Sequence, residues 1–158
     1  MVAFLSLVIP ARVFAKADIS KITIKGADLK TPIEITGPKT LANFNVWTGP
    51  GTSGTIPKGA DRFVIEWSQG ATERPKGVPR YEVSFYEKLP NERLVYVVLY
   101  EYDPAAEGGY IYLPGRGDEW YRLNIGTIFH GVEGRWFRAW SGWDSVARPL
   151  IKGAKGTT

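Results

Sequence analysis

A chain of 158 residues, 44% of them hydrophobic and 13% aromatic, is long enough for one globular domain with a packed core. Its 20 basic and 16 acidic residues are interspersed, so the domain offers no strong positive field and nucleic-acid binding is not expected. Because the chain has no cysteine, disulfides, thiolate metal sites and cysteine nucleophiles are excluded.

The first 17 residues have the pattern of a signal peptide. Val2–Ile9 is an apolar run, Pro10 breaks it, and Ala15 and Ala17 are small residues at the positions that a signal peptidase reads. We therefore expect cleavage after Ala17 and an exported protein; a first strand or short helix packed on the domain is the alternative. The run is shorter than the roughly 20 residues that span a bilayer, so no stable membrane insertion is expected.

Short strands separated by turns are predicted for the first half of the mature chain. The predicted strands are residues 19–24, 33–35, 43–46 and 62–67. Between the last two, residues 47–62 contain four glycines and two prolines, which predicts a long surface loop.

The clearest predicted hairpin lies in the middle of the chain. Tyr81, Val83 and Phe85 alternate with polar residues, which predicts a strand with one face on the core. Its partner, residues 94–102, is apolar on both faces and should be central. A short strand, residues 110–113, follows and should end at Pro114, which cannot donate to a sheet.

The last third predicts one more hairpin and little helix. Strands near residues 125–129 and 135–140 flank a turn at Gly131 and Gly134, residues 143–151 could form a helical turn or two, and residues 152–158 should be a flexible tail. The predicted fold is therefore all-β, a single domain of residues 18–151. An antiparallel β-sandwich is favoured, with a partly open β-barrel as the alternative.

Residues 118–143 are the candidate functional segment, because they hold four of the six tryptophans and the only histidine. Period-two geometry places Trp136, Arg138 and Trp140 on one face of a strand, with the arginine between two indoles, an arrangement that suits cation–π stacking. The same indoles could instead fill the core or form a structural ladder. The predicted ligand-binding residues are Trp120, Tyr121, Arg122, Trp136, Arg138 and Trp140.

The sequence predicts an exported, non-catalytic binding module that uses this aromatic surface to bind carbohydrate or a partner protein. A secreted hydrolase is one alternative, because paired carboxylates can divide acid and base roles. A structural or assembly protein is another. No catalytic residue, metal site or cofactor is expected. The side chains that a hydrolase could use are Glu66, Asp118, Glu119, His130 and Glu133.

Overall fold

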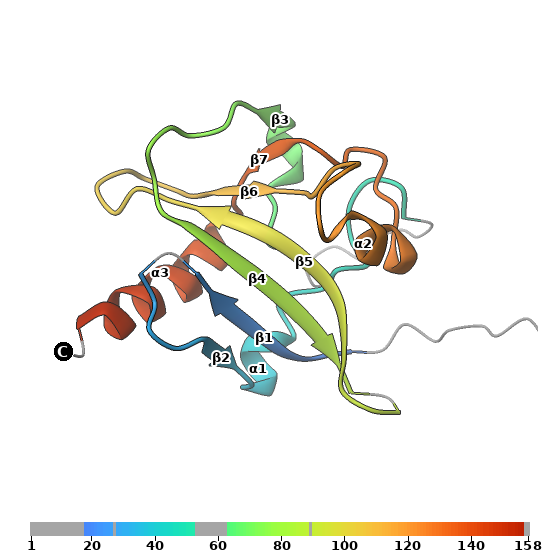
Figure 1. Ribbon diagram of the computed structural model, residues 1–158, viewed down its shortest axis with the longest axis horizontal. Coiled ribbons are helices and arrows are strands. Elements are labelled where there is room, and N and C mark those ends of the chain that lie inside the picture. The colour runs from blue at the N-terminus through green and yellow to red at the C-terminus, as the bar shows by residue number, and fades with distance from the viewer. Residues whose placement is uncertain (1–17, 27, 53–62, 89, 157–158) are drawn as a thin grey trace, which may run out of the picture.

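The structure, a computed structural model, describes residues 18–26, 28–52, 63–88 and 90–156. Seven antiparallel strands form one sheet in the order β2-β1-β4-β5-β6-β7-β3 (Figure 1). The strands are β1 (Ile19–Lys25), β2 (Ile33–Ile35), β3 (Ala71–Thr72), β4 (Arg80–Glu87), β5 (Arg93–Glu101), β6 (Tyr110–Tyr112) and β7 (Trp136–Arg138). The helical segments are α1 (Pro38–Leu41), the 3-10 turn η1 (Trp67–Gln69), α2 (Tyr121–Thr127) and α3 (Ser141–Gly156). The predicted leader, residues 1–17, lies outside the described residues.

The β4–β5 hairpin occupies the centre of the sheet and confirms the clearest sequence prediction. Tyr81, Val83 and Phe85 all point to one face, where they are fully buried. We call this the inner face, and the opposite one the outer face. The register pairs these three residues with Tyr100, Val98 and Tyr96 of β5.

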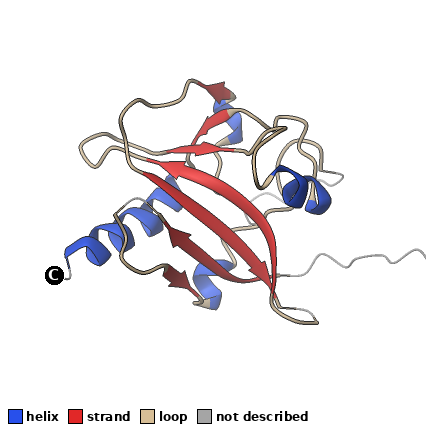
Figure 2. Ribbon diagram, viewed as in Figure 1, coloured by secondary structure: helices blue, strands red, loops and turns tan. Residues whose placement is uncertain are grey.

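Helix α3 covers the inner face, and Figure 2 shows it passing behind the strands. Trp143, Ala147 and Ile151 are four residues apart and fully buried, so they form one apolar stripe along the helix. The Trp143 indole packs edge-on against the rings of Phe44 and Tyr100, with centroids 5.3 and 5.9 Å away. The helix is longer than the predicted turn or two, and its last turn contains residues 152–156, which were expected in a flexible tail.

Asp144 links α3 to the sheet through two hydrogen bonds. Its Oδ1 accepts from the Tyr100 hydroxyl at 2.5 Å, and its Oδ2 accepts from the Gly109 N–H at 2.8 Å. A β-carbon on Gly109 would lie within 3.0 Å of both the Tyr100 ring and the Asp144 carboxylate. Glycine is therefore required at residue 109, where the chain enters β6.

Three predicted strands are replaced by other structure. Residues 43–46 do not form a strand but follow α1 as irregular structure that buries Phe44. Of the predicted strand 62–67, residue 62 lies outside the described residues, Ile65 forms an isolated bridge to Ala139, and η1 begins at Trp67. Residues 125–129 overlap α2, so the predicted hairpin with β7 does not form and β7 pairs with β6 and β3 instead. These segments complete the core by side-chain burial rather than by a strand ladder.

The mostly antiparallel β-architecture is confirmed, whereas the sandwich is not. The described residues form a single sheet with β2 and β3 at its edges. Its inner face packs against α3 and the buried residues of α1 and of segment 63–65 instead of a second sheet. No helix among the described residues is long and apolar enough to span a membrane.

Candidate functional site

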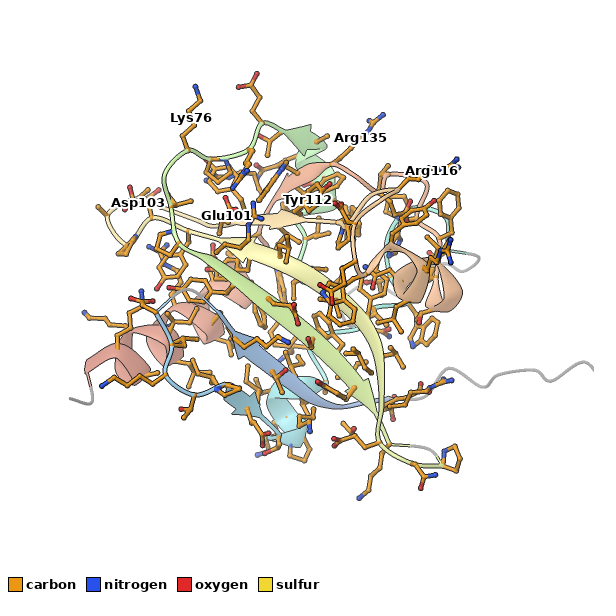
Figure 3. The ribbon with its side chains drawn as sticks, viewed as in Figure 1. Lys76, Glu101, Asp103, Tyr112, Arg116 and Arg135 are labelled. Atoms are coloured by element: carbon orange, nitrogen blue, oxygen red, sulfur yellow. The ribbon has the colours of Figure 1, made fainter. Side chains whose placement is uncertain are left out.

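Aromatic and arginine side chains gather on the outer face of the sheet. The register aligns Leu99, Tyr112 and Trp136 across β5, β6 and β7 in one row. It aligns Glu101, Tyr110 and Arg138 in the next row. Figure 3 labels Glu101 and Tyr112 on this face, which is turned toward the viewer. We define the aromatic–arginine face as Arg74, Arg80, Glu101, Tyr110, Tyr112, Trp136 and Arg138.

The rings and guanidinium groups of this face form two stacks. Tyr112 and Trp136 have ring centroids 5.0 Å apart at an interplanar angle of 31°, and the Arg74 guanidinium carbon lies 5.6 Å from the Trp136 ring. The Arg138 guanidinium carbon lies 4.5 Å from the Tyr110 ring, and its Nη2 donates to the Glu107 carbonyl at 3.0 Å. Both cation–π distances fall within the favourable range of about 6 Å.

The predicted Trp136–Arg138–Trp140 ladder is not formed. Arg138 stacks on Tyr110, and Trp140 packs on the core side with its ring 6.0 Å from Phe44 at 70°. The reason is that β7 ends at Arg138, and the Trp140 carbonyl already accepts the first two hydrogen bonds of α3. Strand alternation therefore stops before it reaches Trp140.

Glu101 pairs with two of the three arginines of the face, Arg74 and Arg80. Its carboxylate is 1% exposed and accepts from Arg80 Nε at 2.7 Å and from Arg74 Nη2 at 3.1 Å. A buried carboxylate needs such charged partners, because desolvation otherwise makes the ionised form costly. Glu101 thus holds Arg74 beside Trp136 while both guanidinium groups remain about half exposed.

Trp120 joins the outer face, whereas Tyr121 and Arg122 lie on α2. The Trp120 Nε1 donates to Glu82 Oε2 of β4 at 3.0 Å. One turn further along α2, the fully buried Asn124 accepts from the Val97 N–H at 2.9 Å and donates to the Val97 carbonyl at 2.7 Å. Asn124 thus replaces a strand partner for β5 where β6 no longer pairs, and its amide is not available to a ligand.

A cavity of about 640 Å³ lies between α2, β5 and the segment around Trp47. Its walls include the predicted residue Arg122, along with Arg93, Leu94 and Ile128. Sequence reasoning identified Arg122 but not the cavity. The cavity depends on helix α2 standing beside β5, whereas the sequence predicted a strand near residues 125–129, which overlap the end of that helix.

The carboxylates that a hydrolase could use have separate local partners. Glu66 accepts from the Ser68 hydroxyl at 2.6 Å as the cap of η1. Asp118 Oδ2 accepts from the Tyr112 hydroxyl at 2.8 Å and from the Gly115 N–H at 2.7 Å. Glu119 is exposed. Only Glu133 lies against another candidate, because its Oε1 accepts from the His130 backbone N–H at 2.6 Å.

His130 is buried and held in one orientation. Its Nδ1 lies 2.7 Å from the Pro50 carbonyl, which can only accept, so Nδ1 carries the proton. Burial lowers the pKa of His130 below its ordinary value, although the Pro50 hydrogen bond and Glu133 oppose this shift. The ring is therefore neutral at pH 7, and Nε2 is an unprotonated base.

Four buried polar atoms in this region have no hydrogen-bond partner within the described parts of the chain. They are Trp67 Nε1, the Tyr96 hydroxyl, His130 Nε2 and Glu133 Oε2. The Trp67 and Tyr96 rings lie 5.2 and 6.0 Å from the His130 ring. With His130 only 3% exposed, the arrangement is that of an interior polar cluster enclosed by aromatic rings.

No group of three His, Cys, Asp or Glu side chains in the described ranges gathers to hold a metal ion. Comparison with known proteins finds no matching family model, and neither a curated protein nor a solved structure matches the chain significantly. The functional proposal therefore rests on the chemistry of the chain's own surfaces.

Proposed function

We propose that this protein is a binding module whose contact surface is the aromatic–arginine face, and that its ligand is a protein segment with acidic side chains. The observation that carries the proposal is the stack of Arg74, Trp136 and Tyr112, which is built on a sheet face yet stays partly accessible. Tryptophan, tyrosine and arginine are the residues most enriched at the energetic centres of protein interfaces.

A protein ligand is favoured over a carbohydrate by the orientation of the rings. A sugar stacks on an open, flat ring face, but Tyr112 and Trp136 lie 5.0 Å apart at 31°, so each ring covers a face of the other. Arg74 lies over the Trp136 ring as well. What remains accessible is a mixture of ring edges and guanidinium groups, which suits peptide carboxylates and carbonyls better than a sugar ring.

The charge of the face supports an acidic ligand. The face holds three arginines and one buried carboxylate, Glu101, which pairs with Arg74 and Arg80. Asp118 at the rim accepts a hydrogen bond from the Tyr112 hydroxyl. The face therefore keeps an excess of positive charge, and guanidinium groups bind carboxylates through two parallel hydrogen bonds.

We also propose that the domain acts outside the cytoplasm after removal of residues 1–17. The support is the apolar run, the following proline and the two alanines at the cleavage positions. N-terminal sequencing of the protein recovered from the culture medium or periplasm should begin at Asp18. A retained Met1 would refute the leader.

The contact surface can be tested by selecting ligands from a random peptide display library and, in parallel, from a glycan array. We expect selected peptides to be rich in Asp and Glu. Arg74→Gln and Trp136→Ala should each weaken their binding at least tenfold, whereas Arg116→Gln and Phe129→Ala should not, because these exposed residues lie off the face.

Three results would overturn the proposal. Selection of glycans but no peptides would show that the ligand is a carbohydrate. Peptide affinities that survive both Arg74→Gln and Trp136→Ala would place the contact surface elsewhere. A concentration-independent oligomer in size-exclusion chromatography, lost in Trp136→Ala, would instead make this face an assembly interface.

A further inference from the structure

We infer that the cavity between α2 and β5 is a second binding site, which takes a small organic anion with an apolar body. The cavity lies beside β5, its lining shares no residue with the aromatic–arginine face, and the inference does not depend on the proposed function.

The cavity exists because a helix replaces a strand beside β5. β6 pairs with β5 only at residues 99–101. On that side of β5, residues 93–98 have no strand partner among the described residues. Asn124 bonds to both main-chain groups of Val97, and the Thr127 hydroxyl donates to the Val95 carbonyl. Since α2 is attached through side chains, it stands further from β5 than a strand would, and space remains between them.

Most of the cavity wall is apolar. Its apolar residues come from three segments: Trp47 from the segment after α1, Leu94 from β5, and Leu123 and Ile128 from α2 and its C-cap residue. A volume of about 640 Å³ is within the range of about 300–1,000 Å³ that is usual for small-molecule sites. A ligand with a hydrocarbon or aryl body would remove this apolar surface from water.

The polar groups of the wall favour a negative charge on the ligand. Both threonine hydroxyls are already used as donors, Thr52 to the Gly49 carbonyl and Thr127 to the Val95 carbonyl. The remaining side-chain donors are the Trp47 indole N–H and the guanidinium groups of Arg93 and Arg122, of which only the guanidinium groups are charged, and no carboxylate among the described residues lines the cavity.

The two arginines differ in their partners. Arg93 forms an ion pair with the buried Glu87, so its charge is compensated. Arg122 is exposed at the cavity and forms no ion pair within the described residues. The cavity therefore carries one uncompensated positive charge, which a carboxylate can neutralise through a two-point hydrogen bond.

The test uses octanoate as the anionic probe and octanamide as its neutral match, followed by NMR titration and calorimetry. Arg122→Gln removes the charge, and Gly126→Leu fills the space, because a β-carbon on Gly126 meets no atom within 4 Å. Arg116→Gln and Gly153→Leu are the matched controls, an exposed arginine and a helical glycine outside the cavity lining.

We expect octanoate to shift the resonances of cavity residues and to bind at least tenfold more tightly than octanamide. Arg122→Gln should abolish that preference, Gly126→Leu should prevent binding of both probes, and the controls should bind as the wild type does. Equal binding of octanamide, or an unchanged preference in Arg122→Gln, would overturn the inference. Absence of octanoate binding would also overturn it. So would binding of inorganic phosphate as tight as that of octanoate, because the apolar wall would then contribute nothing to affinity.

Discussion

Tyr100 and Tyr112 lie on the neighbouring strands β5 and β6 but point to opposite faces of the sheet. The hydroxyl of each donates a hydrogen bond to an aspartate on its own face. Tyr100 is fully buried on the inner face, 2.5 Å from Asp144 Oδ1, whereas Tyr112 is half buried on the outer face, 2.8 Å from Asp118 Oδ2. Burial raises the pKa of both phenols and the aspartates add to the effect, and the pKa of Tyr100 rises far more.

The difference shows how one sheet separates structural from accessible aromatic groups. On the inner face, α3 excludes water, so an unpaired polar group there has no replacement partner. On the outer face, water can replace a lost partner, and the aromatic and guanidinium groups stay available to a ligand. Substitutions on the inner face should therefore reduce the free energy of unfolding more than matched substitutions on the outer face. Only the outer ones should weaken ligand binding.

The largest expected effect is at the tryptophans. Trp143→Ala should reduce the free energy of unfolding by about 3–5 kcal/mol, because the fully buried indole leaves a cavity between α3 and the sheet. Trp136→Ala should cost less than about 1 kcal/mol, because that ring is partly solvated. Urea unfolding followed by circular dichroism measures both. Equal losses would mean that the outer face is part of the core.

The next largest effect is at the edge of β5, where α2 is attached. Asn124→Ala leaves the N–H and carbonyl of Val97 without partners, and at about 1–2 kcal/mol for each of the two groups, the lower part of the usual range, the expected loss is about 2–4 kcal/mol. Asn43→Ala is the control, since its exposed amide bonds among the described residues to the Lys39 carbonyl alone, and it should cost under about 0.5 kcal/mol. Similar losses for the two would show that α2 does not depend on Asn124.

Asn124 also explains why part of the fold could not be predicted from sequence. The β4–β5 hairpin was predictable because Tyr81, Val83 and Phe85 alternate locally. Segment 121–127 was not, because its helix is fixed by Asn124 bonding to Val97, 27 residues away. Likewise, α3 contains Pro149 and glycines that weaken a helical pattern, and its buried stripe against the sheet outweighs them.

The candidate site was partly predictable for a similar reason. Alternation along a strand correctly placed Trp136 and Arg138 on one face. It could not show that the strand ends before Trp140, or that Arg74, from a distant loop, covers the Trp136 ring. Tyr112 was within a predicted strand, but its place beside Trp136 depends on the register between β6 and β7.

The tyrosine pair provides a direct test of the two faces with a single-atom change. Tyr100→Phe removes a buried hydrogen bond to a carboxylate and should cost about 1.5–3 kcal/mol. Tyr112→Phe should cost no more than about 0.5 kcal/mol, because water replaces the hydroxyl at Asp118. Thermal and urea unfolding give the two values. A larger loss at Tyr112 than at Tyr100 would reverse the assignment of the faces.

The smallest effect concerns pH, and it separates the interior polar cluster from the outer face. Burial lowers the pKa of His130 in the folded protein, so between that lowered pKa and the unfolded pKa of about 6.5 the unfolded chain binds more protons than the folded one. The contribution of His130 to stability is therefore complete above about pH 6.5 and is lost as pH falls below it, with a slope of at most about 1.4 kcal/mol per pH unit. Urea unfolding between pH 7.5 and 5.5 should show this slope in the wild type. It should be absent in His130→Gln, whose amide can still donate to the Pro50 carbonyl, and unchanged in Trp136→Ala. If His130→Gln keeps the full slope, the histidine is not the group that titrates, and its ring is more accessible to water than its 3% exposure implies.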